Sequence, residues 1–176
     1  MSGQDFLGQL KKKFGDRITG SNLTAVDPWI EVAPEGLVDV CQFLKTDKNL
    51  QFDMLNLVTA VDYLETDPKK AAKSEVKPHL EVVYHLSSIA KKHTLVVKVM
   101  LPRWKGDVPG ELPEVPSLVE VWKSADWHER EVYDLSGVRF IGHPDMRRIL
   151  CPDDWVGHPL RKDYEMPLEY HGIRGR

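Results

Sequence analysis

The residues of this chain best suited to chemistry lie in one stretch, residues 126–164, which carries many Asp, Glu, Arg, His and Trp side chains. Residues 126–135, DWHEREVYDL, have apolar side chains at helical spacing and predict a short amphipathic helix. From residue 137 to 176 no hydrophobic period follows, and so long an irregular segment is uncommon in a compact domain unless it is functional or contacts a partner. We therefore expect residues 137–176 to form an extended C-terminal strap, whose part after about Gly157 becomes ordered only on a partner.

Metal-dependent hydrolysis is one chemistry that these residue types allow. The pair His128-Glu129 matches the start of the zinc-protease helix motif, but that motif needs a second His four residues after the first, and Val132 stands there. His143, Cys151 and His158 offer further zinc ligands, yet both histidines stand in Gly-His-Pro turns and no fourth ligand lies at motif spacing. We therefore expect no metal site.

Glu131 is the carboxylate with the most unusual predicted position. Trp127, Glu131 and Leu135 recur every four residues, so Glu131 is predicted to lie on the apolar stripe of the helix. An ionised carboxylate is costly there unless it is paired, and the expected partners are arginines that fold back on it: Arg139, Arg147 or Arg148. We interpret such a pair as an architectural lock, and the alternative is a carboxylate that handles protons.

The sequence offers interface residues rather than catalytic motifs. It contains no nucleophile elbow, no phosphate-binding glycine-rich loop and no dinucleotide fingerprint. The strap combines aromatic and basic residues in the manner of interface anchors, which are Trp155, Tyr164, Tyr170, Arg161, Lys162 and Arg174. The alternative is that Trp155 covers the core of its own domain. We expect the chain alone to be non-catalytic.

Composition excludes several classes of function. A formal charge of −3, from 24 Lys and Arg against 27 Asp and Glu, provides no basic face for nucleic acid. Cys41 and Cys151 are too few for an iron–sulfur cluster, so we expect no cofactor in this chain. No apolar run approaches the roughly 18 residues of a membrane span, and the N-terminus lacks a signal-peptide pattern. We expect a cytoplasmic protein that meets a membrane only through its partners.

Hydrophobic periodicity predicts the elements that carry this stretch. Helices are expected at residues 4–14 and 34–44, and strands at 29–32, 52–61, 80–87 and 94–101, the last two as an antiparallel hairpin. Prolines at 102, 109, 113 and 116 predict a connection without regular structure, and capping patterns at Ser117 and Asp126 predict two short helices, the second ended by Gly137. The predicted fold is an α/β two-layer domain with helices on a mixed sheet of about four or five strands. Its parts are a body (1–103), a proline-rich connection (104–116), two short helices (117–136) and the strap (137–176).

The order of residues in this stretch also resembles a known family. Residues 129–131 (ERE), 134–135 (DL), 142–150 (GHPDMRRIL) and 152–164 (PDDWVGHPLRKDY) are similar to the C subunit of the bacterial proton-pumping NADH:quinone oxidoreductase, respiratory complex I. The match is dense over about forty residues, which is far more specific than a short motif. It departs at Leu135-Ser136, where the family usually has two apolar residues. Residues 1–100 resemble the family more loosely, with matches at Asp62-Tyr63 and at residues 84–86.

The resemblance implies a non-catalytic peripheral-arm subunit that clamps the hydrogenase-like D subunit to the B subunit, which carries the terminal iron–sulfur cluster, beside a ferredoxin-like subunit. In such a complex, other subunits hold FMN, the iron–sulfur clusters, NADH and quinone, and electron transfer drives proton translocation. The chain would lie peripherally on the cytoplasmic side of the bacterial inner membrane. The motif marks the following structural or interface positions: Glu129, Arg130, Glu131, Asp134, His143, Arg147, Arg148, Trp155, His158, Arg161, Lys162, Asp163 and Tyr164.

Two other functions stay open on the sequence. The homologous subunit of a membrane-bound nickel–iron hydrogenase complex would share the motif, and only the neighbouring subunits would separate the two. A freestanding metal-dependent hydrolase would belong to a different class and would use His128, Glu129, Asp134 and His143. Metal analysis of the purified chain would reveal it.

Overall fold

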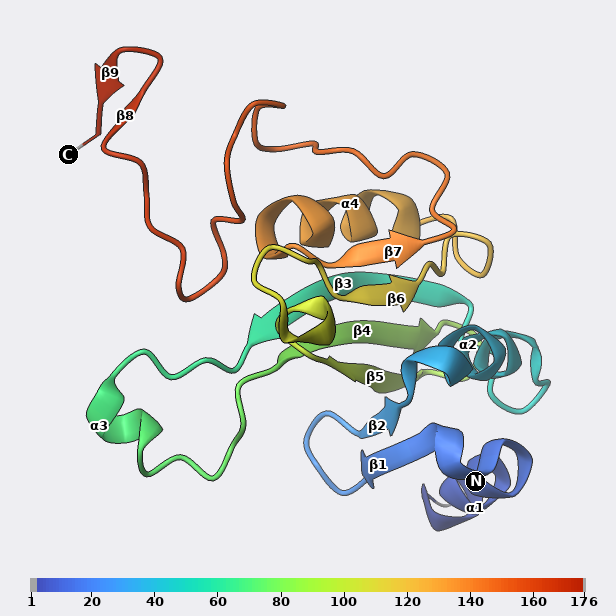
Figure 1. Cartoon of the computed structure of the whole chain (residues 1–176). Coiled ribbons are helices and arrows are strands. Elements are labelled where there is room, and N and C mark those ends of the chain that lie inside the picture. The colour runs from blue at the N-terminus through green and yellow to red at the C-terminus, as the bar shows by residue number, and fades with distance from the viewer. Residues whose placement is uncertain (1–2, 176) are drawn as a thin grey trace.

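A mixed five-stranded β-sheet forms the centre of the chain in a computed structural model that describes residues 3–175 (Figure 1). Its strands are β1 (Ile18–Asn22), β2 (Trp29–Val32), β3 (Met54–Asp62), β4 (Leu80–Ser88) and β5 (His93–Leu101), in the spatial order β1-β2-β5-β4-β3. Within this sheet β2 and β5 run parallel, and the other neighbours are antiparallel. The predicted fold, helices on a mixed sheet of four or five strands, is confirmed.

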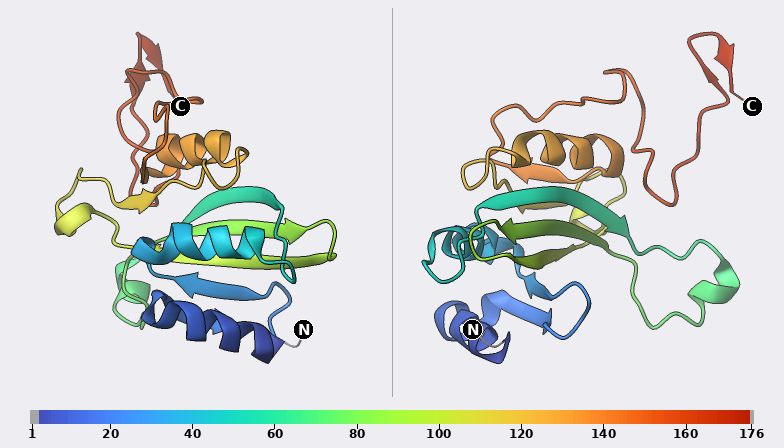
Figure 2. Two further views of the ribbon diagram at one scale, coloured as in Figure 1. Left: turned by 90° about the vertical axis from the view of Figure 1, so that its right-hand side faces the viewer. Right: turned by 180° about the vertical axis from the view of Figure 1, so that it is seen from behind.

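The sheet has an apolar inner face, because alternate residues of β4 and β5 point to the same side. Tyr84 pairs with Val97 and Val82 with Val99, and all four are buried. Helix α2 (Leu37–Thr46), which follows a 3₁₀ turn at Pro34–Gly36, covers this face through a stripe that the sequence predicts: Leu37, Val40, Cys41 and Leu44. Helix α1 (Gly3–Phe14) lies beside α2, where Phe14 meets Phe43 edge to face. No helix within residues 3–175 covers the outer face of the sheet (Figure 2, right).

The second half of the chain adds a β–α–β unit next to β3. Strand β6 (Glu114–Pro116) pairs in parallel with β7 (Arg139–Ile141), and helix α4 (Ala125–Ser136) connects them and packs on β3. Two differences from the predicted elements appear here. The proline-rich connection contains β6 and a short 3₁₀ turn at Lys105–Asp107, and residues 117–124 form turns rather than the first of the two expected short helices.

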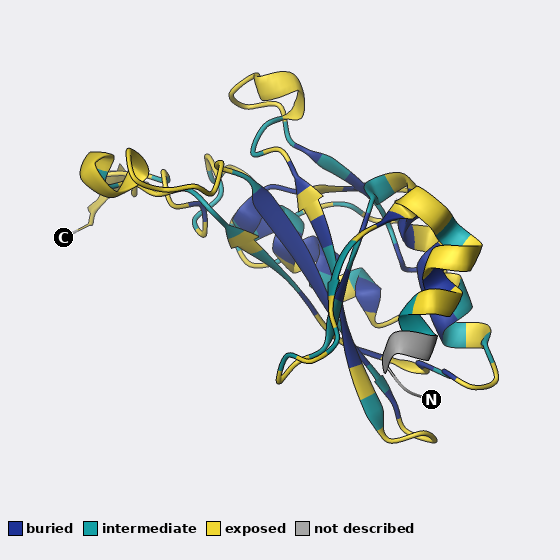
Figure 3. Ribbon diagram, turned by 90° about the horizontal axis from the view of Figure 1, so that it is seen from below, coloured by how far each residue is buried: buried dark blue, intermediate teal, exposed yellow. Residues whose placement is uncertain are grey.

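The strap leaves β7, passes over α4 and ends in the small hairpin β8 (Glu169–Tyr170) and β9 (Ile173–Arg174), away from the sheet (Figures 1 and 2). A separate loop between β3 and β4, which includes the short helix α3 (Pro68–Ala71), projects from the body. Buried residues gather in the sheet, whereas the C-terminal end is largely exposed (Figure 3). Over residues 3–175, no helix combines the length and the apolar character that crossing a membrane requires.

Candidate functional site

The C-terminal end of α4 is the point at which the strap is bound. The last carbonyl groups of an α-helix have no partner within the helix and need donors from elsewhere. Gly137 ends the helix in the left-handed conformation, with φ 68°, and its N–H donates to Tyr133 O. A Cβ at this position would lie 2.5 Å from the His158 ring, so the close approach of the strap requires glycine as well as the turn.

The strap supplies the donors that these carbonyls need. The donors are the side chains of His158 and Arg161 and the backbone N–H of Leu160, which stands between them in the sequence. The guanidinium of Arg161 also suits the negative end of the helix dipole. The contacts are His158 Nδ1 to Asp134 O (2.9 Å), Leu160 N to Leu135 O (2.8 Å), Arg161 Nε to Ser136 O (2.9 Å) and Arg161 Nη2 to Gly137 O (2.9 Å).

The buried carboxylate of Asp134 holds the preceding turn of the strap. It accepts three successive backbone N–H groups, from Ile149 (3.1 Å), Leu150 (2.7 Å) and Cys151 (2.8 Å), and a charged hydrogen bond from Arg148 Nη1 (2.6 Å). Burial alone would raise the pKa of Asp134, but the N–H groups of Cys151 and Leu150, the Arg148 guanidinium and the N–H of Ile149 outweigh it and hold the pKa at about 2. The site is therefore built for an ionised carboxylate.

Arg161 is a buried cation whose hydrogen bonds all end on backbone carbonyls. Besides its two bonds to the helix end, Nη1 donates to Arg103 O (2.7 Å), and the guanidinium lies 3.9 Å from the centre of the Trp104 ring. Burial, followed by the nearby Arg103 charge, lowers the pKa of Arg161 to about 10. The side chain thus joins the strap, α4 and the connection after β5.

Arg103 forms a second junction slightly further along the strap. Its guanidinium binds Asp62 at the end of β3 (2.9 Å) and Asp163 of the strap (2.7 Å). Asp62 also accepts the backbone N–H of Lys162 (3.1 Å). Burial would lower the pKa of Arg103, but the two carboxylates outweigh it and raise the pKa above its usual value. The prediction that the chain after Gly157 is ordered only on a partner is wrong for residues 158–163, because they bind their own domain.

Arg130 and His143 fix the start of the strap to the outer side of α4. The Arg130 guanidinium is buried, donates to Arg147 O (3.2 Å) and Arg148 O (3.3 Å), and lies 3.6 Å from Asp145. His143 Nε2 lies 3.1 Å from the backbone oxygen of Asp126. Both residues of the sequence motif therefore serve the attachment of the strap.

Glu129 is the second buried carboxylate of α4, and it binds the segment before the helix. It accepts the hydroxyl of Ser117 (2.6 Å) and the N–H of Leu118 (2.7 Å). The Ser117 hydroxyl also accepts the N–H of Val119 (3.2 Å), but residues 117–124 form turns and not the expected capped helix. Burial raises the pKa of Glu129 to about 7, although the Ser117 and Leu118 bonds oppose the rise.

The predicted lock at Glu131 is wrong. Glu131 is exposed and makes no ion pair with any described residue, and Trp127 on the same row is 67% exposed. The expected partners lie elsewhere: Arg148 binds Asp134, Arg147 binds Asp145 and Arg139 is exposed on β7. The buried row of α4 is instead Ala125, Glu129, Val132 and Ser136.

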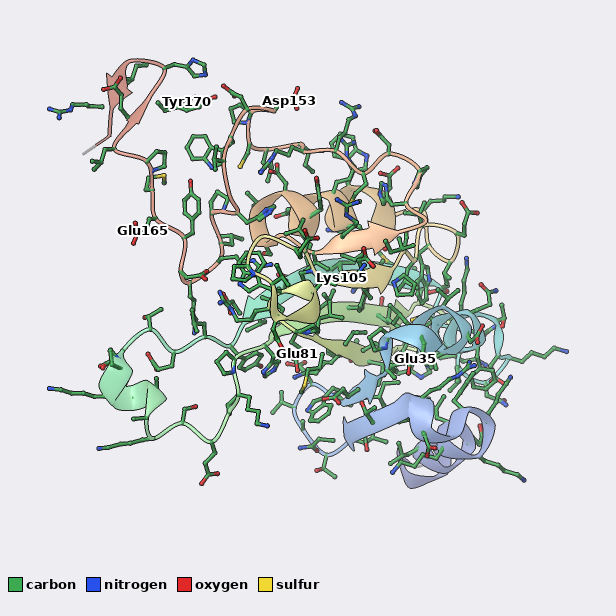
Figure 4. All side chains as sticks on the ribbon, in the orientation of Figure 1. Glu35, Glu81, Lys105, Asp153, Glu165 and Tyr170 are labelled. Carbon is green, nitrogen blue, oxygen red and sulfur yellow. The ribbon has the colours of Figure 1, made fainter. Side chains whose placement is uncertain are left out.

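The remaining motif residues lie in the outer part of the strap. Trp155 is half-buried and packs on Tyr170 of β8, with ring centres 5.0 Å apart, and Tyr170 donates to Asp154 (2.7 Å), next to the Asp153 seen in Figure 4. The Tyr164 ring lies against Gly157, where a Cβ would approach it to 2.8 Å. The Lys162 side chain is exposed. These aromatic residues join turns of the strap to one another.

The two carboxylates that a hydrolase would use have structural partners in this chain. Glu129 and Asp134 are both fully buried, and they bind opposite segments, one before and one after α4. Within residues 3–175, no three His, Cys, Asp or Glu side chains gather in a way that could hold a metal ion. The geometry is that of a structural attachment.

Sequence reasoning missed Asp62, Arg103 and Trp104 as parts of this site. Asp62 and Arg103 stand 41 positions apart, and the strap meets Asp62 after 100 positions. A partial signal existed at Asp62-Tyr63, which matches the family locally. Arg103 and Trp104 follow a strand in a proline-rich segment, which gives no period from which their burial can be predicted.

Comparison with known proteins identifies relatives over most of the chain. Residues 30–170 match the family model described as respiratory-chain NADH dehydrogenase, 30 Kd subunit. The NADH-quinone oxidoreductase C subunit of Chloroherpeton thalassium is 42% identical over 94% of this chain, which spans only 62% of that relative's length. The protein of the same name from Geobacter sulfurreducens is 44% identical over 90% of this chain and 86% of its own length.

The fold is also found in a respiratory membrane complex of known structure. A chain of the membrane-bound sulfane sulfur reductase, an archaeal respiratory membrane complex, superposes with a TM-score of 0.69. The alignment covers 93% of the present chain and 86% of the archaeal one, at 24% sequence identity. This similarity supports the assignment of the fold.

Proposed function

Since this chain belongs to the family of the 30 kDa subunit of respiratory-chain NADH dehydrogenase, we propose that it is a non-catalytic subunit of a proton-translocating NADH:quinone oxidoreductase. In this proposal FMN, iron–sulfur clusters, NADH and quinone are bound by other subunits, and the chain holds no cofactor. It lies in the peripheral arm, on the cytoplasmic side of the membrane.

The role that we propose is to clamp the hydrogenase-like subunit and the terminal iron–sulfur subunit together through the strap, beside the ferredoxin-like subunit. A displacement of about 1 Å at a reacting centre can cost orders of magnitude in rate. A protein that fixes the positions of two others can therefore be essential without contacting substrate.

This role is supported by one observation: the strap binds its own domain through backbone groups and Arg161, while its apolar side chains face solvent. Leu160 donates its N–H to α4 and the next side chain, Arg161, is buried, yet the Leu160 side chain is 62% exposed. Val156 is 86% exposed, and further apolar residues of the strap are also exposed: Leu150, Met166, Leu168 and Ile173. A fixed backbone that presents apolar side chains to water is typical of a protein interface.

The test places a charge on this surface without touching the attachment. In Val156→Asp with Leu160→Asp, the isolated chain should unfold at the wild-type urea concentration, whereas the amount of assembled complex in membranes should fall at least about tenfold, because each buried charge would be uncompensated. Val26→Asp is the matched control, since Val26 is fully exposed on the loop between β1 and β2.

Turnover per assembled complex separates a clamp from a catalytic part. The clamp predicts nearly normal NADH:quinone turnover in the complexes that still form. Normal abundance of the double variant would contradict the interface, and normal abundance with lost turnover would indicate a direct role in the reaction.

A further inference from the structure

The outer face of the sheet is more apolar than a face that serves only to meet water. Register places Leu57 of β3 beside His85, Val96 and Trp29, and Val61 beside Glu81 and Met100. Solvated faces of antiparallel strands usually carry polar residues at alternate positions. Here large apolar side chains occur on every strand from β2 to β5, with the polar side chains of Glu81, His85 and Lys98 between them. Together they form the apolar patch of this face: Trp29, Met54, Leu57, Val61, Val83, Val96 and Met100.

This patch is only partly covered by its own neighbours. Val83 and Val96 are nearly buried by the larger side chains around them, whereas Met54 is 48% exposed and Met100 47% exposed at opposite ends of the face. No helix within residues 3–175 lies on this side, as the view from behind shows (Figure 2, right). Exposed apolar side chains that gather on one face, as Met54, Leu57, Val61 and Met100 do, are typical of an interaction site.

The charges beside the patch identify the chemistry of a partner. The cation at its centre, Lys98, is neutralised by Glu81 (3.1 Å) and lies over the Trp29 ring (4.8 Å). Next to Met100, a groove of about 440 Å³ has apolar walls from Val32, Leu101 and Pro102. Glu31 and Glu35 line the same groove.

Neither glutamate is neutralised within the described chain. Glu31 accepts a hydroxyl hydrogen bond from Thr19, and Glu35, on the 3₁₀ turn before α2, is exposed and forms no ion pair with a described residue. His79, the other titratable group of the groove, is stacked on Tyr63 and binds Lys77 O. Uncompensated negative charge beside an apolar groove is complementary to a Lys or Arg side chain, whose stem is apolar and whose head is cationic.

We propose that the outer sheet face is a second docking surface, which binds a protein partner that presents a Lys or Arg between aliphatic side chains, with the cation between Glu31 and Glu35. The proposal goes beyond the role of the strap, since it concerns a different face. A second copy of this chain, paired face to face, is a poorer occupant, because Lys98, the cation at the centre of its face, is already paired with Glu81.

Methionine oxidation of the chain, free and in the complex purified from membranes, tests the proposal, because each surface carries its own reporter. Met100 and Met54 report the outer face, and Met166 reports the strap. If the partner buries Met100 as fully as a residue in the core of an interface, the oxidation of Met100 should be about fivefold slower in the complex than in the free chain. Equal oxidation of Met100 in the free and assembled chain overturns the proposal, and a protected Met166 in the same sample leaves the clamp intact.

Charge variants then test the chemistry of the partner. Glu35→Lys should restore the oxidation of Met100 in the complex toward its rate in the free chain, and Glu31→Gln should do so in part. Glu75→Lys, the same change on the exposed loop after α3, should not. If Met100 stays protected in the Glu35→Lys complex, the proposal of a cationic partner is refuted. If light scattering shows that the isolated chain is a dimer in which Met100 is protected, the occupant of this face is a second copy of the chain and the proposed partner is wrong.

Discussion

Replacing Asp134 by Asn tests the attachment of the strap most directly. The carboxylate accepts three backbone N–H groups and the Arg148 guanidinium, and its side chain is fully buried. The amide removes the charge, leaves Arg148 without a counter-ion and turns an NH₂ group toward donors. Breaking a buried ion pair by removal of one partner costs about 3–5 kcal/mol, so we expect a loss near 3 kcal/mol for this partly solvated arginine.

The pH dependence of that loss follows from the pKa of Asp134. A fall from the usual value of about 3.9 to about 2 corresponds to roughly 2–3 kcal/mol of stabilisation. The folded state favours the ionised form, so this contribution is complete above the unfolded pKa, near pH 4, and disappears as the pH falls through 2. By pH 3 about half of this pH-dependent contribution should be lost, and the difference in stability between wild type and Asp134→Asn should shrink by that amount.

Urea unfolding followed by circular dichroism at pH 6 and pH 3 measures both effects. With a slope of about 2 kcal/mol per molar urea, a loss of 3 kcal/mol lowers the midpoint by about 1.5 M. Asp153→Asn, an exposed residue of the same strap, is the control and should leave the midpoint unchanged. Equal midpoints for Asp134→Asn and wild type at pH 6 would refute the role assigned to this carboxylate.

Three further predictions concern the strap and the second buried carboxylate of α4. Gly137→Ala should lower stability by at least about 2 kcal/mol in thermal unfolding, because the left-handed backbone would be strained and the new Cβ would meet His158. Gly142→Ala is the control: its φ is 86° but the space around it is open, so it should cost only the backbone strain of about 1 kcal/mol. Equal losses would argue against the close contact with His158. Because burial raises the pKa of Glu129 to about 7, the folded state retains the proton of this carboxyl group, and wild-type stability should fall by up to about 3 kcal/mol between pH 4.5 and pH 7. Glu129→Gln should lack this fall in urea titrations. Parallel pH profiles of the two proteins would contradict the raised pKa. Arg161→Met leaves three carbonyls without donors and should cost about 3 kcal/mol and speed the tryptic cleavage of the strap, and an unchanged cleavage rate would show that the strap is held elsewhere.

Strand and helix positions could be predicted where one face of an element is apolar. The stripe of α2 and the alternation in β4 and β5 are such cases, because burial alone determines those residues. Strand β1 escaped prediction because its sequence ITGSN has one large apolar residue, Ile18, and its place in the sheet depends on pairing with β2.

The helical phase of α4 failed for a different reason. Trp127 and Leu135 look like the apolar stripe, but the row that faces the domain contains a small residue and two polar ones, Ala125, Glu129 and Ser136. Glu129 and Asp134 are tolerated in the interior because backbone N–H groups and a hydroxyl reach them. Those donors belong to segments without periodicity, so no side-chain pattern could reveal them. The family motif named most of the residues of the site and none of their contacts.

The long sequence separation of the strap contacts has a consequence for the order of folding. Arg161 reaches Arg103 across 58 positions, and Lys162 reaches Asp62 across 100. Contacts that close such long loops cost the conformational entropy of loop closure before any favourable interaction forms. They therefore form after local hairpins and helices. Until the sheet and α4 are in place, the carbonyls of residues 134–137 have only water as a partner. We therefore expect the strap to dock in the slowest folding phase, so that its apolar surface takes its final arrangement only on a domain that is already native, and an incompletely folded chain is not incorporated into the assembly.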